Sequence, residues 1–221
     1  TVVVTHRDSD HAGGAAALAS AFPQARWLSS YDPDPARRCV AGQRWLWDGV
    51  AVEVLHPQAD RYRDDGTSAL STNDMSCVLR IEAGGASAWL GGDLTATHEV
   101  RLSMARPHER ATLLLAPHHG SHSSSSPVLL NTLQPRWVVV QAGYRNAFRH
   151  PADAVVQRYA QRGIPWVQTP DCGAARWHSD RPDAMHCERQ ARQRYWHHPG
   201  TPQKATAGPV LAILPAGEKS P

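Results

Sequence analysis

The chain has 221 residues, a length that predicts one domain or one domain with a tail. Its hydrophobic content of 41% is enough for a buried core. The formal net charge is only +3, so the overall charge does not by itself indicate a nucleic-acid partner. No apolar stretch approaches the length of a transmembrane helix, and no signal peptide precedes the first apolar run. Because the chain begins inside that run, we expect a fragment of a longer protein.

The predicted elements alternate between helices and short strands. Two hairpins are expected, one turning at Asp48-Gly49 and one at Gly84-Gly85, because apolar and polar residues alternate beside these turn residues. Strands in two groups with helices between them predict a layered α/β fold. In chain order the prediction is a strand at 2–4, a helix at 15–22, a strand at 25–29, hairpins at 45–55 and 76–90, a helix at about 95–105, strands at 113–116 and 137–140, a helix at about 152–162 with Pro151 in its first turn, and strands at 165–169 and 173–178.

The strongest chemical signal is the segment T-H-R-D-S-D-H-A-G-G at residues 5–14. It follows an apolar run and precedes a helix, which predicts a loop at the carboxyl end of a strand, where α/β enzymes place their chemistry. Imidazole and carboxylate together suit Zn²⁺, Mn²⁺ or Fe, and no thiolate is present to select zinc. The candidate ligands are His6, Asp8, Asp10 and His11.

Three later segments repeat the pattern of polar side chains after an apolar strand. Asp93 follows two glycines, although an aspartate at such a place is a helix cap about as often as a ligand. The pair His118-His119 precedes a run of serines, and we expect only one of the two to face the metals, because adjacent residues of an extended strand point to opposite sides. The segment 143–151 adds His150 and two arginines suited to phosphate.

The order of these motifs, H-x-D-x-D-H, N-D-M-S-C-V-L, G-G-D-L, P-H-H-G-S and G-Y-R-N-x-x-x-H-P, resembles the C-terminal metallo-β-lactamase-like domain of ComEC-type DNA-uptake channel proteins. The resemblance covers about residues 1–198 and leaves 199–221 as a Pro- and Ala-rich tail expected to be disordered. It implies an αββα sandwich that here lacks its N-terminal strands.

The resemblance also implies two divalent metal ions, Mn²⁺ or Zn²⁺, and a set of ligands. His6 and Asp8 would serve the first ion, Asp10 and His11 the second, and Asp93 would bridge them. Asp8 departs from the family pattern, which has His there, and Asn73 lies where many members place another His. The remaining metal positions correspond to His119 (or His118) and His150.

The function implied is a metal-dependent phosphodiesterase that degrades the DNA strand not imported during transformation. Asp10 would orient the attacking water, and His118 or His150 would assist the leaving group. The domain would be extracytoplasmic, part of an inner-membrane protein, with DNA and the membrane channel of the same polypeptide as partners. Residues expected to contact substrate phosphates are Ser121, Arg145, Asn146 and Arg149.

Two other functions fit the same motifs. The domain could hydrolyse a small molecule, as lactonases and thioesterases of the superfamily do, and a closed apolar pocket would favour that. It could also be a non-catalytic module that gates the channel, its site degenerated through Asp8 and Asn73. Failure to bind any metal would favour the gating module.

The chain contains four cysteines, none in a C-x-x-C spacing. Cys39 and Cys77 belong to regions of the two predicted hairpins, and the resembled domain lies outside the cytoplasm. We therefore expect their Cα atoms within about 7 Å, close enough for a disulfide. Two unrelated buried thiols are the alternative.

Overall fold

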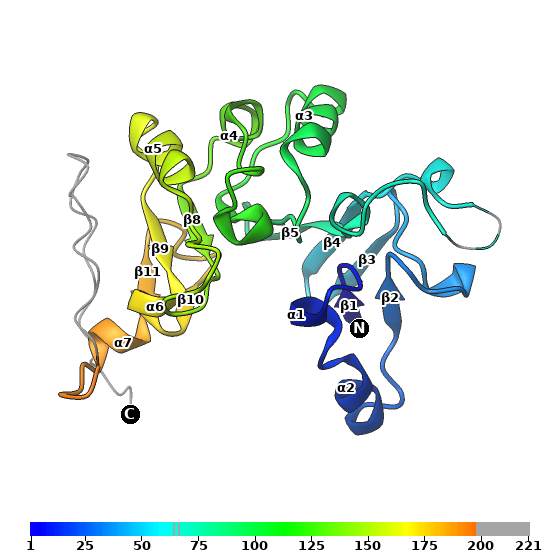
Figure 1. Cartoon of the computed structure of the whole chain (residues 1–221), viewed down its shortest axis with the longest axis horizontal. Helices are drawn as coiled ribbons and strands as arrows, with labels where there is room; N and C mark the ends of the chain where they lie inside the picture. The colour runs from blue at the N-terminus through cyan, green and yellow to red at the C-terminus, as the bar shows by residue number, and fades with distance from the viewer. Residues whose placement is uncertain (64, 66, 198–221) are drawn as a thin grey trace.

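The computed structural model describes residues 1–63, 65 and 67–197. The expected tail at 199–221 lies outside the described residues. A seven-stranded mixed sheet forms the centre of the fold, with strand order β3-β4-β5-β6-β7-β8-β9 (Figure 1). These strands are β3 (Arg44–Trp47), β4 (Val50–His56), β5 (Val78–Ala83), β6 (Ala86–Leu90), β7 (Leu113–Leu115), β8 (Trp137–Val140) and β9 (Trp166–Gln168).

The antiparallel half of the sheet is the two hairpins that the sequence predicts. β3 pairs with β4 across Asp48-Gly49, and β5 pairs with β6 across Gly84-Gly85. All four turn residues have positive φ, from 47° to 79°, the conformation that tight hairpin turns require. Both hairpin predictions are confirmed.

The parallel half is built from strand–helix–strand units. β6, β7, β8 and β9 run parallel, and the helices between them, α3 (Ala96–Ala105), α4 (Pro127–Leu133) and α5 (Asp153–Gln161), lie along one face of the sheet (Figure 1). The main core lies between this face and these helices. It contains Trp89, Leu114, Val138, Leu130 and Tyr159, all at most 1% exposed.

The other face of the sheet is covered by two small sheets. β1 (Val2–Val4) and β2 (Trp27–Ser29) pair in parallel, and Leu28 packs with Val54 and Leu79 of the large sheet. β10 (Ala175–Trp177) and β11 (Met185–Cys187) form an antiparallel pair that packs on Val139 and Val167. Two β layers with helices on the first confirm the mixed α/β fold.

The remaining helical turns are short. They are α1 (Ser9–Ala12), α2 (Ala15–Ala21), α6 (Thr169–Cys172), α7 (Glu188–Ala191), and the 3₁₀ turns η1 (Pro35–Arg37), η2 (Ala59–Arg61), η3 (Asn73–Met75) and η4 (Pro117–Gly120). Within the ranges described, no helix has the length and apolar character needed to cross a bilayer.

Five details differ from the sequence prediction. Residues 9–12, expected in a loop, form the single turn α1, and α4 and β11 were not predicted. Pro151 lies one residue before the N-cap Ala152, so it precedes α5 instead of forming its first turn. The strand expected at 173–178 begins only at Ala175, because Gly173 ends α6 with a φ of 70°.

Both cysteine pairs form disulfides. Cys39 and Cys77 have Cα atoms 5.9 Å apart, which confirms the expected proximity, and Cys172 is bonded to Cys187 with a Cα separation of 4.5 Å. The first bridge joins the segment after β2 to the residue before β5, so it fastens the small β1–β2 sheet to the large one.

We expect the unreduced, unfolded protein to show no reactive thiol and to show four after reduction, counted with a thiol reagent. Replacing Cys39 and Cys77 together by Ser should lower the free energy of unfolding by about 4 kcal/mol, because the bridge closes a loop between residues 38 positions apart. Unfolding in urea measures the loss. Two or more reactive thiols in the unreduced protein would contradict this pairing.

Candidate metal centre

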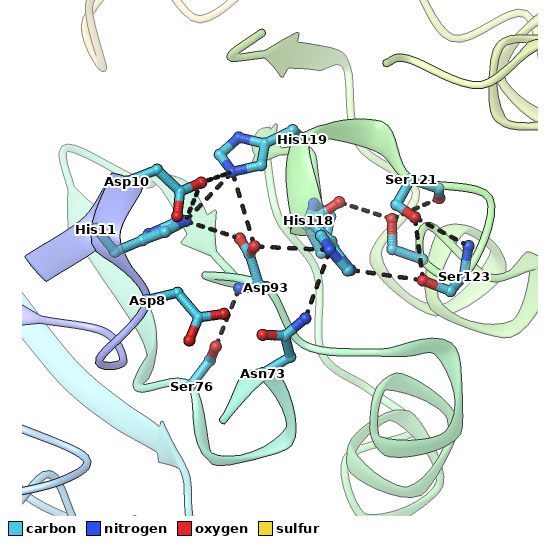
Figure 2. Close-up of polar contacts among 12 residues, drawn as sticks. Asp8, Asp10, His11, Asn73, Ser76, Asp93, His118, His119, Ser121 and Ser123 are labelled. Carbon is cyan, nitrogen blue, oxygen red and sulfur yellow. Dashed lines mark hydrogen bonds and ion pairs between the residues drawn. The ribbon is translucent and has the colours of Figure 1, made fainter. Parts of the chain in front are cut away.

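The candidate site lies where three segments far apart in the sequence meet at one edge of the large sheet (Figure 2). The first follows β1 and runs into α1, the second follows β6, and the third follows β7. Because β6 and β7 are parallel, their carboxyl ends lie at the same edge. The side chains brought together are His6, Asp8, Asp10, His11, Asp93, His118 and His119.

Four of these side chains form a compact cluster in which each offers one ligand atom. These atoms, from Asp10, His11, Asp93 and His119, all lie within 4.8 Å of one another. His11 Nε2 is 3.1 Å from Asp93 Oδ1 and 3.2 Å from His119 Nε2, and His119 Nε2 is 3.2 Å from Asp10 Oδ2 (Figure 2). Two imidazole nitrogens and two carboxylates around one point are a donor set that suits a divalent cation.

A second, looser group surrounds the other side of Asp93. His6 Nε2 lies 3.7 Å from Asp8 Oδ2 and 3.9 Å from Asp93 Oδ2, and His118 Nε2 lies 3.8 Å from the same Asp93 oxygen. His6 is fully buried and its Nε2 has no hydrogen-bond partner among the described residues. An unpaired buried nitrogen aimed at two carboxylates fits a metal ligand, because a metal would satisfy it. Asp93 belongs to both groups.

The protonation of the site follows from burial and from these contacts. Burial is the main reason that the pKa of His6 is lowered, which favours the neutral form that binds metal. A hydrogen bond with Asp93 raises the pKa of His11. Burial alone would raise the pKa of Asp93, but its bond with His11 and the nearby His119 and His118 bring that pKa below its usual value. Asp93 is therefore a carboxylate that is 5% exposed and held by imidazoles.

Both histidines of the P-H-H-G-S segment lie close to Asp93, but only His119 belongs to the compact cluster, so the expectation that only one of them faces the metals stays a prediction. His119 Nε2 is 3.7 Å and His118 Nε2 is 3.8 Å from Asp93 Oδ2. The alternation of an extended strand does not apply here, because His118 and His119 have φ values of 50° and 54° inside the η4 turn. The turn rotates both rings to the same side. His119 Nδ1 is fixed by the carbonyl of Gln141, 2.9 Å away.

Two hydroxyl groups, whose roles the sequence motifs do not indicate, orient the ligands. Thr5 Oγ1 lies 3.0 Å from His6 Nδ1 and 3.3 Å from His11 Nδ1, so one residue fixes two rings. Ser76 Oγ accepts the backbone N–H of Asp93 at 3.0 Å and lies 3.4 Å from His6 Nδ1. Partners of this kind set the tautomer and direction of metal-binding histidines. The sequence feature that could have indicated Ser76 is its place in the N-D-M-S motif.

Ser76 can approach Asp93 closely because the residue before Asp93 is a glycine. Gly92 has a φ of 52°, and a Cβ there would lie 2.8 Å from Ser76 Cβ. Only glycine combines that conformation with that space. Gly92 of the G-G-D sequence therefore allows the backbone to place Asp93 at the site.

The other residues predicted for the site lie around the cluster. Asn73 Nδ2 is 3.4 Å from His118 Nε2, so the amide takes a place beside the second group (Figure 2). The ring of His150 is 6.1 Å from that of His118, and its buried Nδ1 has no hydrogen-bond partner among the described residues. Ser121 is buried, and its hydroxyl lies 3.1 Å from that of Ser123.

The two arginines and Asn146 lie in the loop 143–150. The Asn146 side chain bonds Gly143 O, His150 N and His150 O at 3.1, 2.8 and 2.8 Å. All of its bonding is thus with the loop's own backbone, so Asn146 shapes the loop that carries Arg145 and Arg149. A cavity of about 490 Å³ lies between this loop and the compact cluster, and Asp10 and His119 line it.

A buried carboxylate behind the histidine pair holds the serine-rich loop in place. Glu99 of α3 is fully buried and accepts the backbone N–H groups of Ser125 at 2.7 Å and Ser126 at 2.6 Å. Arg158 of α5 donates to the carbonyl of Ser124 at 2.7 Å. These bonds tie the loop after His119 to two helices. Burial raises the pKa of Glu99 to about 7.

Comparison with known proteins finds relatives of the chain among competence and recombination proteins. The chain is 39% identical over 176 residues to "Competence protein ComA" of Neisseria gonorrhoeae, covering 78% of this chain and 24% of that protein. It is 30% identical over 161 residues to "Recombination protein 2" of Haemophilus influenzae (71% and 19%) and 28% over 194 residues to "ComE operon protein 3" of Bacillus subtilis (80% and 24%). The chain belongs to the ComEC family of competence proteins.

The chain spans about a fifth to a quarter of the length of these curated relatives. No family model matches it. Among solved structures it is similar to the metallo-β-lactamase fold protein YhfI from Bacillus subtilis, with a TM-score of 0.40 and 11% identity over 76% of this chain and 73% of that one.

Replacing Asp93 by Asn should abolish stabilisation by metal. Mn²⁺ or Zn²⁺ at about 100 times its Kd should raise the free energy of unfolding of the wild type by about 2.7 kcal/mol. The amide lacks the negative charge that both ligand groups share, so metal should raise the free energy of unfolding of the variant only slightly. Asp60→Asn, an exposed carboxylate on η2, is the control. Thermal melting with and without metal measures both, and an Asp93→Asn protein stabilised like the wild type would contradict the assignment.

Glu99 predicts a pH dependence of stability with a definite sign. Its pKa is about 7 in the folded chain and has an ordinary value of 4.5. Between these values the folded state holds a proton that the unfolded state has lost. The stability linked to Glu99 is therefore greatest below pH 4.5 and is lost as pH rises through 7, by about 3 kcal/mol.

Glu99→Gln cannot titrate, so the stability difference between wild type and variant should change by that amount from pH 4.5 to 7.5. Urea unfolding at several pH values measures it. Parallel curves for the two proteins would show that Glu99 stays ionised throughout.

Proposed function

We propose that this domain is a metal-dependent phosphodiesterase that cuts DNA and degrades the strand that is not imported during transformation. The observation that carries the proposal is Asp93, a buried carboxylate shared by two groups of imidazole and carboxylate ligands at an open edge of the sheet. The relatives carry competence and recombination names, which supports DNA as the substrate.

The residues present fit two divalent ions. Asp10, His11, Asp93 and His119 would hold one ion, and His6, Asp8 and Asp93, with His118 beside them, would hold the other. Both sets contain only oxygen and nitrogen donors, which suits Mn²⁺ or Zn²⁺, and Asp8, in place of the His of the family pattern, makes its set harder than that pattern. When bound, two such ions would supply Lewis acidity, which lowers the pKa of a coordinated water and offsets negative charge on the phosphate oxygens.

The chain's own groups position the reactants. The side chain of Asp10 is 60% exposed and its Oδ2 faces His119, so it can accept a proton from an attacking water at the rim of the site. His118 Nε2 lies 3.8 Å from Asp93 Oδ2 and the His150 ring lies 6.1 Å from the His118 ring, so either imidazole can assist the leaving oxygen. Ser123 Oγ, 3.5 Å from His118 Nδ1, orients the His118 ring, and Ser121 acts through Ser123.

The substrate phosphates would be held by Arg145 and Arg149. Both lie in the loop that forms one wall of the cavity, and guanidinium groups bind phosphate oxygens without reading bases. Asn146 keeps the loop in shape. A substrate that is degraded regardless of sequence needs contacts of this kind.

The two disulfides support an extracytoplasmic placement, because such bonds persist in oxidising compartments. We propose that the domain lies outside the inner membrane and works beside the membrane channel of the same polypeptide. Its relatives are about four times longer than the matched region, which leaves room for that channel.

Asp10→Asn should reduce Mn²⁺-dependent cleavage of labelled DNA by about 100-fold or more, since it weakens a ligand and removes the proton acceptor. The fold should be intact, because the side chains are nearly isosteric and the residue is exposed. Circular dichroism and melting without metal check this, with Asp60→Asn as the matched control. Wild-type turnover in Asp10→Asn would refute the mechanism. A much lower melting temperature without metal would show that Asp10 is structural.

A further inference from the structure

The loop 143–150 carries exposed aromatic side chains beside the metal centre. Phe148 is 81% exposed, although the chain has only two phenylalanines, and Tyr144 in the same loop is 53% exposed. Burying a phenylalanine side chain stabilises the fold by about 1.5–3 kcal/mol. The exposed Phe148 does not contribute this stabilisation. A single exposed aromatic residue is common, but here its surroundings point to a ligand.

The first of these surroundings is the cavity next to the compact cluster. Phe148 lines the same cavity of about 490 Å³ as Asp10 and His119. A molecule in contact with the Phe148 ring therefore extends to the side chains proposed to hold metal. The exposed ring is part of the site and not of a distant surface.

The second is a row of rings that leads inward from Phe148. Its ring stacks on His150 with centroids 5.8 Å apart and planes inclined by 18°, and the His150 ring lies 6.1 Å from that of His118. His118 Nε2 is in turn 3.8 Å from Asp93. The row fixes the orientation of Phe148 while most of the side chain stays accessible.

The third is the charge and rigidity of the loop. Residues 143–150 contain two arginines and no carboxylate. Arg145 and Arg149 adopt left-handed backbone conformations, with φ values of 49° and 57°, which cost free energy in residues other than glycine. The Asn146 side chain holds the loop with three hydrogen bonds, and the Arg145 guanidinium lies over the Tyr144 ring at 5.2 Å. The aromatic and cationic groups are thus presented on a loop ordered in advance.

We infer that this loop is a stacking platform that selects single-stranded DNA as the substrate of the centre. An unpaired base stacks on Phe148 while Arg145 and Arg149 bind the adjoining phosphates, and the strand then passes into the cavity. Aromatic stacking combined with cationic groups is how proteins bind single strands without reading sequence. In a duplex the base faces are covered by neighbouring pairs, so Phe148 has no partner. The inference rests on the proposed function, since it names the form of DNA that the site takes.

The test measures binding separately from cleavage. Fluorescence anisotropy with the full 221-residue chain in EDTA compares three labelled DNAs: a single-stranded 12-mer, the same 12-mer with abasic interior positions, and its blunt duplex. Phe148→Ala should weaken binding of the single strand by about 5- to 150-fold, the loss of one stacked base. Binding of the abasic strand, which has the same phosphates, should not change.

Two further variants separate stacking from general damage. Phe148→Trp keeps a large ring and should retain wild-type affinity. Trp47→Ala removes an aromatic residue that is 66% exposed on the distant β3–β4 hairpin, and it should leave binding of the single strand unchanged. Melting curves of the Phe148 variants should match the wild type, because the side chain is exposed.

Three results would overturn the inference: equal affinity of Phe148→Ala and wild type for the single strand, equal losses with normal and abasic strands, or a wild type that prefers the duplex. Cleavage with Mn²⁺ is measured in parallel. If the wild type cuts DNA and Phe148→Ala binds the single strand normally, the platform is wrong and the proposed function stands. If the wild type cuts no DNA but Phe148→Ala loses the single strand selectively, the platform stands and the proposed hydrolysis is wrong.

Discussion

The structure around the site depends on one constraint, which is the placement of a buried carboxylate among four histidine side chains. A carboxylate removed from water is costly unless charged or hydrogen-bonding partners surround it. Asp93 meets that requirement through His11 at 3.1 Å and through His6, His118 and His119 at 3.7–3.9 Å. The two loops that supply these partners must therefore end at the same point as β6, and the parallel order of β6, β7 and β8 makes this possible.

A second layer of bonds keeps these partners in place, and it is continuous with the fold. Cys77 donates its backbone N–H to Thr5 at 2.9 Å, and its neighbour Ser76 bonds Asp93, so the disulfide to Cys39 fastens the point at which the small sheet meets the ligands. On the other side, Glu99 fixes the loop that follows His119. The ligand rings are thus attached to both β layers and to the helices.

Much of this could be predicted from local pattern, and the failures have physical causes. Alternation and turn residues located both hairpins, and the apolar runs located β7 and β8. The helix α4 was missed because it has seven residues and begins directly after serines that read as a solvated loop. The rotation of His118 and His119 depends on left-handed conformations that intrinsic preference disfavours and tertiary bonds enforce. The orienting roles of Thr5 and Ser76 arise only from contacts between distant segments, which no local pattern encodes.

The wide separation of the ligands along the chain has a consequence for synthesis. Asp10 and His119, whose side chains lie 3.2 Å apart, are 109 positions apart. At about 5–20 residues per second a ribosome takes on the order of 5–20 s to pass from one to the other. Until His118 and His119 have been made, the nascent chain holds at most five of the seven side chains that meet at the site, and strand β7 is completed only just before them. The complete set of candidate ligands therefore exists only after β7 has been made.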